Sequence, residues 1–248
     1  MEPIIIVGHR GSSRIAPENT LPAFELAWAE GADAIEGDFH LTRDGHIVCI
    51  HDGDTKRVSG KRLVIKDSTL DELRQLDVGF YRGKEYKGTF IPTIEEVFAT
   101  IPAHKMIYIE IKSEGEIVPR LFEEINRSGL QREQIAVISL NDQVIRKCKT
   151  KGLQSKAFWV CEFKKEQAGE ITPSLETVRE TLERINADGL SSNKGVINEP
   201  FARGIMEHGY EFHVWAVDDL EMAKQYIKWG ARSITTNIPG YMVRNLKG

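Results

Sequence analysis

Charged side chains recur at every second position in two short apolar runs of the sequence. Glu36 and Asp38 are two residues apart in the run 34–39, and Glu110 precedes Lys112 by the same spacing. Residues two apart in an extended strand project from the same face. Carboxylates gathered on such faces raise each other's pKa and therefore need a compensating cation. Oxygen ligands favour Mg²⁺, with Ca²⁺ as the alternative, over zinc, which prefers Cys and His.

Two histidines and two basic side chains accompany the carboxylates. His9 and Arg10 follow the first apolar run, and His51 ends an extended piece of chain. A histidine pair can act as general base and general acid near neutral pH, while Arg10 and Lys112 can direct positive charge at phosphate oxygens. A divalent cation, two histidines and two basic groups are together what cleavage of a phosphate ester requires.

Each of these residues also has a purely structural interpretation. A single histidine or a carboxylate pair in a strand is more often a solvated face or a salt bridge than a site. Glu110 and Lys112 can equally form an ion pair inside a barrel, and Trp215 can serve packing as well as a site. We interpret Asn19 and Asp218 as helix N-caps. The other histidines sit in loops, near helix ends or on strands without charged company, and we assign no role to His40, His46, His104, His208 and His213.

Short β-branched runs alternate with segments of helical period along the chain. The expected strands span residues 4–7, 34–39, 106–111, 135–139, 154–160, 189–191, 212–217 and 233–236, with a further extended piece at 47–51. About eight strand–helix units in 248 residues predict an α/β fold, the (β/α)₈ TIM barrel. A doubly wound open sheet is the alternative. It is disfavoured because Gly8-His9-Arg10-Gly11 after the first strand is no dinucleotide-binding fingerprint.

The barrel prediction places all the candidate groups together, because parallel strands present their C-terminal ends at one mouth. Residues 53–91 interrupt the alternation: they are irregular and polar, with one short helix expected at 70–76. They lack an apolar pattern of their own. We therefore interpret them as a small insertion after strand 2 within a single domain, 1–248.

Composition excludes several other classes of protein. Hydrophobic residues make up 41% of the chain, and 33 basic against 37 acidic residues give a net charge of −4, which argues against a nucleic-acid partner. No apolar run approaches the ~20 residues of a membrane span, and none at the N-terminus suits a signal peptide. Three cysteines in no pattern indicate free thiols, and hence a cytoplasmic location. The oligomeric state stays open.

Over essentially its whole length the chain resembles the glycerophosphodiester phosphodiesterases. The resemblance is densest in the first 52 residues, and the motifs occur in the family's order and spacing. They are His9-Arg10-Gly11, Pro17-Glu18-Asn19-Thr20, Glu36-Gly37-Asp38, Thr42-Arg43-Asp44-Gly45, His51-Asp52 and Ile109-Glu110-Ile111-Lys112.

The resemblance implies a barrel with a small insertion after the second strand. It also implies roles for the candidate residues: metal ligands Glu36, Asp38 and Glu110, an acid/base pair His9 and His51, and phosphate contacts Arg10 and Lys112. To the substrate-binding group we add Trp215. The implied substrates are small glycerophosphodiesters, such as glycerophosphocholine and glycerophosphoethanolamine, cleaved to an alcohol and sn-glycerol 3-phosphate.

Two positions depart from the family's pattern. Where the family usually has Trp-Thr-Val-Asn the chain has Trp215-Ala216-Val217-Asp218, and where it often has Thr-Asp the chain has Thr236-Asn237. We expect both departures to concern substrate contacts, and neither to touch the metal or the histidines.

Two other functions fit the same residues. A lysophospholipase D-like enzyme acting on lysophospholipids would share the metal and histidine set, but it would need an exposed apolar surface or a membrane anchor, and we find neither in the sequence. A non-catalytic barrel that only binds phosphodiesters would not need an intact proton-transfer and metal set.

Overall fold

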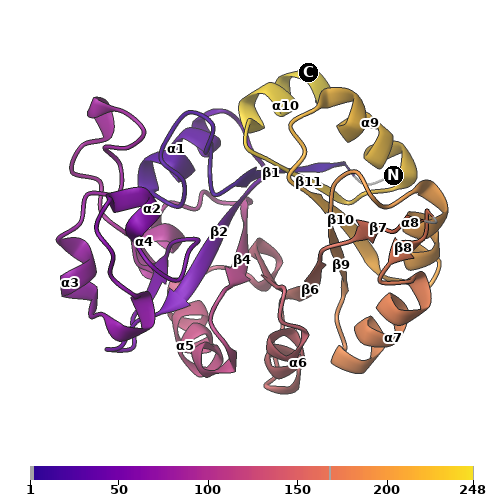
Figure 1. The fold of residues 1–248 in the computed structure, drawn as a ribbon, viewed down its shortest axis with the longest axis horizontal. Helices are drawn as coiled ribbons and strands as arrows, with labels where there is room; N and C mark the ends of the chain where they lie inside the picture. The colour runs from indigo at the N-terminus through magenta and orange to yellow at the C-terminus, as the bar shows by residue number, and fades with distance from the viewer. Residues whose placement is uncertain (1–2, 168, 248) are drawn as a thin grey trace.

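Eight parallel strands form a closed ring in the computed structural model, which describes residues 3–167 and 169–247 (Figure 1). The ring is closed because β1 pairs with β2 on one side and with β11 on the other. The strands are β1 (Ile5–His9), β2 (Ala34–Leu41), β4 (Met106–Ile111), β5 (Ile135–Ser139), β6 (Lys156–Cys161), β9 (Gly189–Asn193), β10 (Glu211–Trp215) and β11 (Ser233–Thr236). The predicted TIM barrel is confirmed, and the expected strand ends agree with these bounds within two residues.

Helices cover the outside of the ring, as Figure 1 shows. They are α1 (Leu21–Ala29), α4 (Ile94–Ala99), α5 (Val118–Ser128), α6 (Asp142–Thr150), α7 (Leu175–Ile185), α8 (Glu199–Met206), α9 (Leu220–Trp229) and α10 (Pro239–Leu246). Their ends follow from local chemistry. The Thr93 hydroxyl and the Glu96 side chain form a reciprocal capping box at the start of α4. Gly129 ends α5 with a φ of 72°, a left-handed conformation that glycine adopts without strain.

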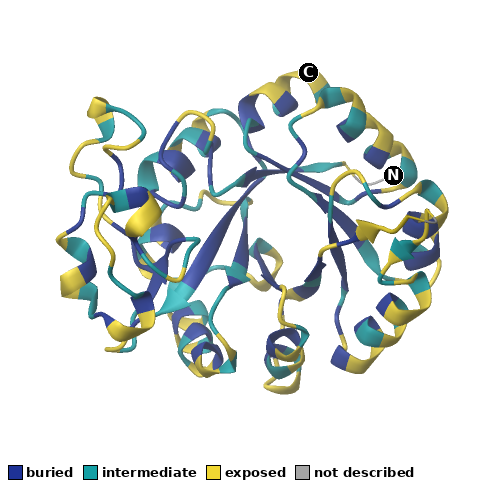
Figure 2. Ribbon diagram, viewed as in Figure 1, coloured by how far each residue is buried: buried dark blue, intermediate teal, exposed yellow. Residues whose placement is uncertain are grey.

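The alternation of side chains within a strand separates two cores. In β4, Ile107, Ile109 and Ile111 are buried in the layer between strands and helices, whereas Tyr108 packs inside the barrel. The strands are accordingly the most buried part of the ribbon, and exposed residues lie on the outer faces of the helices (Figure 2). Even-numbered residues of β2 and β4 therefore face the barrel interior, which is the face expected to carry the polar groups.

An excursion of the chain follows β2. The short strand β3 (Ile47–Cys49) pairs antiparallel with the end of β2, and residues 53–91 then form α2 (Lys56–Ser59) and α3 (Leu70–Arg74) before α4. Although these residues show no periodic apolar pattern, they do not lack apolar packing. They share a small core of their own with the end of β3: Val48, Ile50, Val58, Ile65, Leu73, Leu76, Val78 and Ile91. Its members are spaced too irregularly for a periodic signal.

Two further features were not expected from the sequence. A two-stranded ribbon, β7 (Lys164–Lys165) with β8 (Ile171–Thr172), follows β6. His213, assigned no charged neighbours, lies inside the barrel with its Nε2 3.4 Å from Glu211 Oε2. Its Nδ1 is 2.8 Å from Ser233 Oγ, so this histidine belongs to a buried polar group at the start of β10.

The three cysteines are buried and free, as expected. Burial raises the pKa of the Cys148 and Cys161 thiols to about 12, so neither is activated as a nucleophile. Within residues 3–167 and 169–247, no helix is both long and apolar enough to cross a membrane.

Glu211 gives the stability of the barrel a defined pH dependence. Burial raises its pKa, but the hydrogen bond and charge of His213, together with Lys156, outweigh burial and lower the pKa from 4.5 to about 2. A depressed carboxyl pKa stabilises the folded state above pH 4.5, and this contribution is lost as the pH falls towards 2. We expect Glu211→Gln to lower the free energy of unfolding by about 1 kcal/mol at pH 7, allowing for solvent screening.

Urea unfolding at pH 7 and at pH 3 measures this difference. The gap between wild type and Glu211→Gln should narrow at pH 3, whereas the exposed control Glu221→Gln should stay near wild type at both values. A gap of equal size at both pH values would contradict the role given to the Glu211 charge.

Candidate active site

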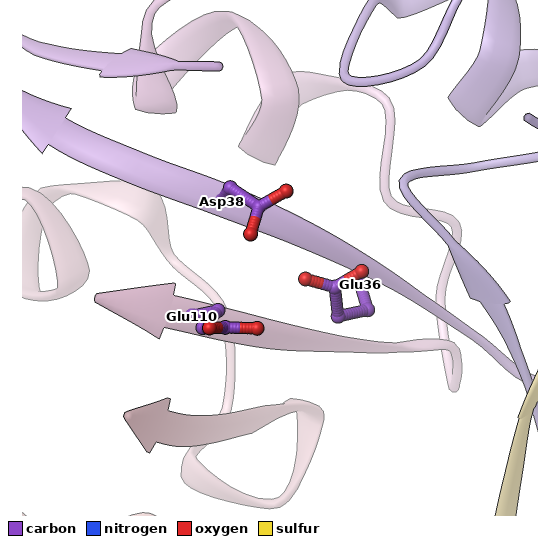
Figure 3. Close-up of side chains that lie close together, drawn as sticks. All are labelled: Glu36, Asp38 and Glu110. Atoms are coloured by element: carbon purple, nitrogen blue, oxygen red, sulfur yellow. The ribbon is translucent and has the colours of Figure 1, made fainter. Parts of the chain in front are cut away.

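Three carboxylates meet at the C-terminal mouth of the barrel. Glu36 and Asp38 project from β2 and Glu110 from β4, and Figure 3 shows the three side chains directed towards one another. The register places Asp38 directly beside Glu110. One oxygen from each residue lies within 4.8 Å of the others, so the three could hold a single metal ion. The convergence expected from strand alternation is therefore present.

Asp38 is the most heavily neutralised of the three. Its carboxylate accepts a hydrogen bond from Asn19 Nδ2 at 2.8 Å, and lies 3.2 Å from Arg10 Nε and 3.4 Å from Lys112 Nζ. Burial raises its pKa, but the charges of Arg10, Lys112 and His51 outweigh burial and hold the pKa below its ordinary value. Asp38 is therefore ionised in the folded protein.

The negative charges of Glu36 and Glu110 are less well balanced by nearby positive groups than that of Asp38. Burial raises the pKa of Glu36 well above its ordinary value, and the charges of Asp38 and Glu110 raise it further. Burial and the Asp38 charge likewise raise the pKa of Glu110, although Lys112 Nζ donates to its Oε1 at 2.9 Å. Glu36 Oε1 is fully buried without a hydrogen-bond partner. An orphaned carboxylate oxygen beside two other carboxylates fits a divalent cation, which supplies the missing positive charge.

A strained turn after β1 positions the backbone around this group. Arg10 and Asn19 both adopt left-handed conformations, with φ of 56° and 57°. Residues other than glycine rarely adopt such values, at a cost of about 1 kcal/mol or more each. The turn directs the Arg10 backbone N–H at Glu36 Oε2, 2.9 Å away. A Cβ at Gly11 would lie 2.5 Å from the backbone of Ala23, so the turn requires glycine there.

His9 ends β1 beside Glu36. Its Nε2 lies 3.9 Å from Glu36 Oε2, and its Nδ1 is 2.8 Å from Asn237 Oδ1. Burial lowers its pKa and the Arg10 charge lowers it further, so the ring is held in the neutral form. The expectation that neither departing position touches a histidine was therefore wrong for Asn237.

His51 approaches from the excursion after β2. Its Nδ1 is 2.8 Å from Asp52 Oδ1, and the other oxygen of Asp52 accepts from Arg57 Nε at 2.7 Å. Arg57, on α2, also contacts both oxygens of Glu18, whose Oε1 in turn accepts from Arg10. The small core of residues 53–91 thus supports α2, and α2 holds the orientation of His51.

A cavity of about 100 Å³ opens between these groups. Trp215 lines it with its indole N–H bonded to the carbonyl of Ser191 at 3.3 Å. Of the residues proposed from the sequence, all but Asp38 line this cavity: His9, Arg10, Glu36, His51, Glu110, Lys112 and Trp215. Asp38 lies beneath it, tied to Arg10, Asn19 and Lys112.

Two of the expected helix caps were wrong. Asn19 is no cap: it donates to Asp38 Oδ2 and accepts from the Asp38 backbone N–H. Asp219, and not Asp218, caps α9, while Asp218 accepts hydrogen bonds from Thr236 and Asn237. Both residues lie between a strand and the next helix. An Asn or Asp at such a position can be either a helix cap or a site residue, and the sequence alone does not distinguish the two.

Comparisons with known proteins all relate this chain to phosphodiesterases. The glycerophosphoryl diester phosphodiesterase family model matches residues 9–241. A glycerophosphodiester phosphodiesterase of Caldanaerobacter subterraneus subsp. tengcongensis is 32% identical over 243 residues, covering 96% of each chain. A phosphodiesterase structure from Oleispira antarctica, in complex with the product sn-glycerol-3-phosphate, superposes with a TM-score of 0.88 at 25% identity, covering 98% of this chain and 97% of that one.

Because the carboxylates outnumber the nearby positive charges, we expect a bound cation to change the unfolding temperature, which can be measured without an activity assay. With EDTA present, Glu36→Gln should unfold at the wild-type temperature or a few degrees above it, because the substitution removes a buried like-charge repulsion. Saturating Mg²⁺ or Ca²⁺ should raise the unfolding temperature of wild type, and that of Glu36→Gln much less. Glu211→Gln, at the opposite end of the barrel, is the matched control and should keep the full response. An equal cation response in Glu36→Gln would refute the metal site.

Proposed function

Because the chain belongs to the glycerophosphoryl diester phosphodiesterase family, we propose that it cleaves small glycerophosphodiesters, such as glycerophosphocholine and glycerophosphoethanolamine. The products would be an alcohol and sn-glycerol 3-phosphate, the product bound in the Oleispira relative. The observation that carries the proposal is the convergence of three carboxylates, two histidines and two basic side chains at one mouth of the barrel, where all of them except Asp38 line a single cavity. Its volume of about 100 Å³ suits a glycerol phosphate group better than a large ligand.

We assign the metal to Glu36, Asp38 and Glu110, with Mg²⁺ as the resident cation and Ca²⁺ as the alternative. All three ligands are carboxylates, which suit these hard cations. The three buried free thiols are compatible with the cytoplasm we propose, where Mg²⁺ is abundant. When bound, the cation would neutralise the carboxylates and the negative charge of the phosphate.

Arg10 and Lys112 are the proposed phosphate contacts. Both line the cavity, and both now donate to carboxylates: Arg10 to Glu18, and Lys112 to Glu110. Once a bound cation balances the charge of the carboxylates, the N–H groups of Arg10 and Lys112 can turn to a bound phosphate. Trp215 presents its ring at the same cavity and would form an apolar wall against the substrate.

The two histidines would carry the proton transfers in two steps. In the first, His9 takes the proton of the glycerol 2-hydroxyl, whose oxygen attacks phosphorus. His51 gives a proton to the departing alcohol as its bond to phosphorus breaks. In the second, His51 takes a proton from water, the water oxygen attacks phosphorus, and His9 returns its proton to the 2-oxygen as the cyclic phosphate opens.

The partners of the two rings support this assignment. His51 Nδ1 faces the carboxylate of Asp52, which accepts a hydrogen bond from that nitrogen and so leaves Nε2 to give a proton to the departing alcohol. His9 Nδ1 faces the neutral amide of Asn237 and the ring is held neutral, as a base requires. Direct attack by water is the rival route, and it forms no cyclic intermediate.

Exposed apolar residues favour a second candidate, hydrolysis of lysophospholipids. Phe80 and Tyr81 are 53% and 44% exposed, and line an open hollow of about 580 Å³ together with Arg57. Arg57 bonds to the Asp52 that holds His51, so this hollow adjoins the site. Such a surface could accept one acyl chain, and it is the apolar feature that an enzyme of this kind requires.

One assay tests these proposals together. Enzyme stripped with EDTA should release no glycerol 3-phosphate from glycerophosphocholine or glycerophosphoethanolamine, and Mg²⁺ or Ca²⁺ should restore release. His9→Ala and His51→Ala should each lower kcat by about 100-fold or more, whereas His208→Ala, remote from the mouth, should not. Phosphorus NMR during turnover should show a transient cyclic phosphate.

Activity unaffected by chelation would contradict the metal assignment, and full activity in either site variant would contradict the histidine roles. Turnover of a substrate lacking the 2-hydroxyl, without a cyclic phosphate, would favour direct water attack. Faster cleavage of lysophosphatidylcholine than of the glycerophosphodiesters would favour the second candidate.

A further inference from the structure

Behind His9 lies a hydrogen-bonded pair that the reaction itself does not use. Asn237 Oδ1 is 2.8 Å from His9 Nδ1 and accepts from Ser13 Oγ at 3.1 Å. Asn237 Nδ2 donates to Asp218 Oδ2 at 2.9 Å. Asp218 Oδ1 accepts two more hydrogen bonds at 2.9 Å, from the Asn237 backbone N–H and from Thr236 Oγ1. Asp218 thus fixes both the backbone and the side chain of Asn237.

The charge of Asp218 decides which way the Asn237 amide points. Although burial raises its pKa, hydrogen bonds from Asn237 and Thr236 hold the pKa of Asp218 below its ordinary value. An ionised carboxylate only accepts hydrogen bonds, so it requires the amide NH₂ on its side. The amide oxygen then faces His9. An amide oxygen only accepts hydrogen bonds, so the ring nitrogen that faces it, Nδ1, must carry a proton.

We propose that Asp218 and Asn237 act as positioning residues that hold His9 in the tautomer protonated on Nδ1. The lone pair is then on Nε2, the nitrogen beside Glu36. Because the partner of His9 is a neutral amide, its orientation is fixed without a fourth negative charge next to the three carboxylates. The kinetic part of this inference rests on the proposed role of His9 as a base, and the tautomer itself does not.

Single and double exchanges of the pair test the proposal. In Asp218→Asn, the new amide oxygen must accept from the fixed Asn237 backbone N–H, so the new NH₂ would face the NH₂ of Asn237. This conflict is relieved when Asn237 turns its own NH₂ towards His9. The proton would move to Nε2, and we expect kcat to fall by about 100-fold or more with KM changed by less than about 3-fold. Asn237→Asp places two carboxylates together and should also impair kcat.

The double variant, Asp218→Asn with Asn237→Asp, restores a match between donor and acceptor. The NH₂ at 218 would donate to the carboxylate at 237, whose other oxygen would accept from His9 Nδ1. Its kcat should recover at least about 10-fold over Asp218→Asn, which a merely structural role would not explain. Asp219→Asn is the matched control, since asparagine caps a helix as well as aspartate does, and it should behave like wild type.

Nitrogen-15 NMR of the His9 ring decides the tautomer independently of activity. Wild type and the double variant should show protonated Nδ1, and Asp218→Asn should show protonated Nε2. Unchanged Nδ1 protonation in Asp218→Asn, or a double variant no faster than the single ones, would overturn the proposal. Were His9→Ala fully active, the role of His9 as base would fail, while the NMR result would still decide the tautomer.

Discussion

The mutual repulsion of three buried carboxylates is the constraint on which the mouth of this barrel depends. Glu36, Asp38 and Glu110 lie close enough together to hold one ion. The pKa values of Glu36 and Glu110 are raised because burial, and then the charge of the neighbouring carboxylates, outweighs the nearby basic groups. Arg10 and Lys112 both lie beside Asp38, and each also pairs with a second carboxylate, Arg10 with Glu18 and Lys112 with Glu110. A divalent cation could balance the remaining negative charge, and the neutral Asn237 amide behind His9 adds no further charge to it.

The rest of the architecture holds these groups in place. The barrel register sets Asp38 beside Glu110, and His9 beside Glu36. The left-handed turn at Arg10 brings a backbone N–H to Glu36. The excursion after β2 contributes through a chain of contacts, from its own apolar core to α2 and then through Arg57 and Asp52 to His51. The Nδ1 atoms of the two histidines thus contact different parts of the chain: His9 contacts Asn237, after β11, and His51 contacts Asp52, in the excursion after β2.

The alternation of strand and helix segments along the chain was enough to predict the barrel, and the alternation within two strands predicted that Glu36, Asp38 and Glu110 would converge. Alternation alone placed Glu36 and Asp38 on the interior face, because a strand fixes the direction of every second side chain. The supporting contacts could not be predicted in this way. Asn19, Asp218 and Asn237 bond to residues that are distant in sequence or across strand ends, and their types equally suit helix caps. The core of residues 53–91 was missed because its members follow no period.

We propose that one divalent cation compensates the three carboxylates. Anomalous diffraction from crystals of the wild-type protein grown with Mn²⁺, a cation that accepts the same oxygen ligands, would locate this ion. We expect a single strong peak in this mouth, in contact with oxygens of Glu36, Asp38 and Glu110. A mouth without a peak at saturating Mn²⁺, or a peak that omits Glu36, would contradict it.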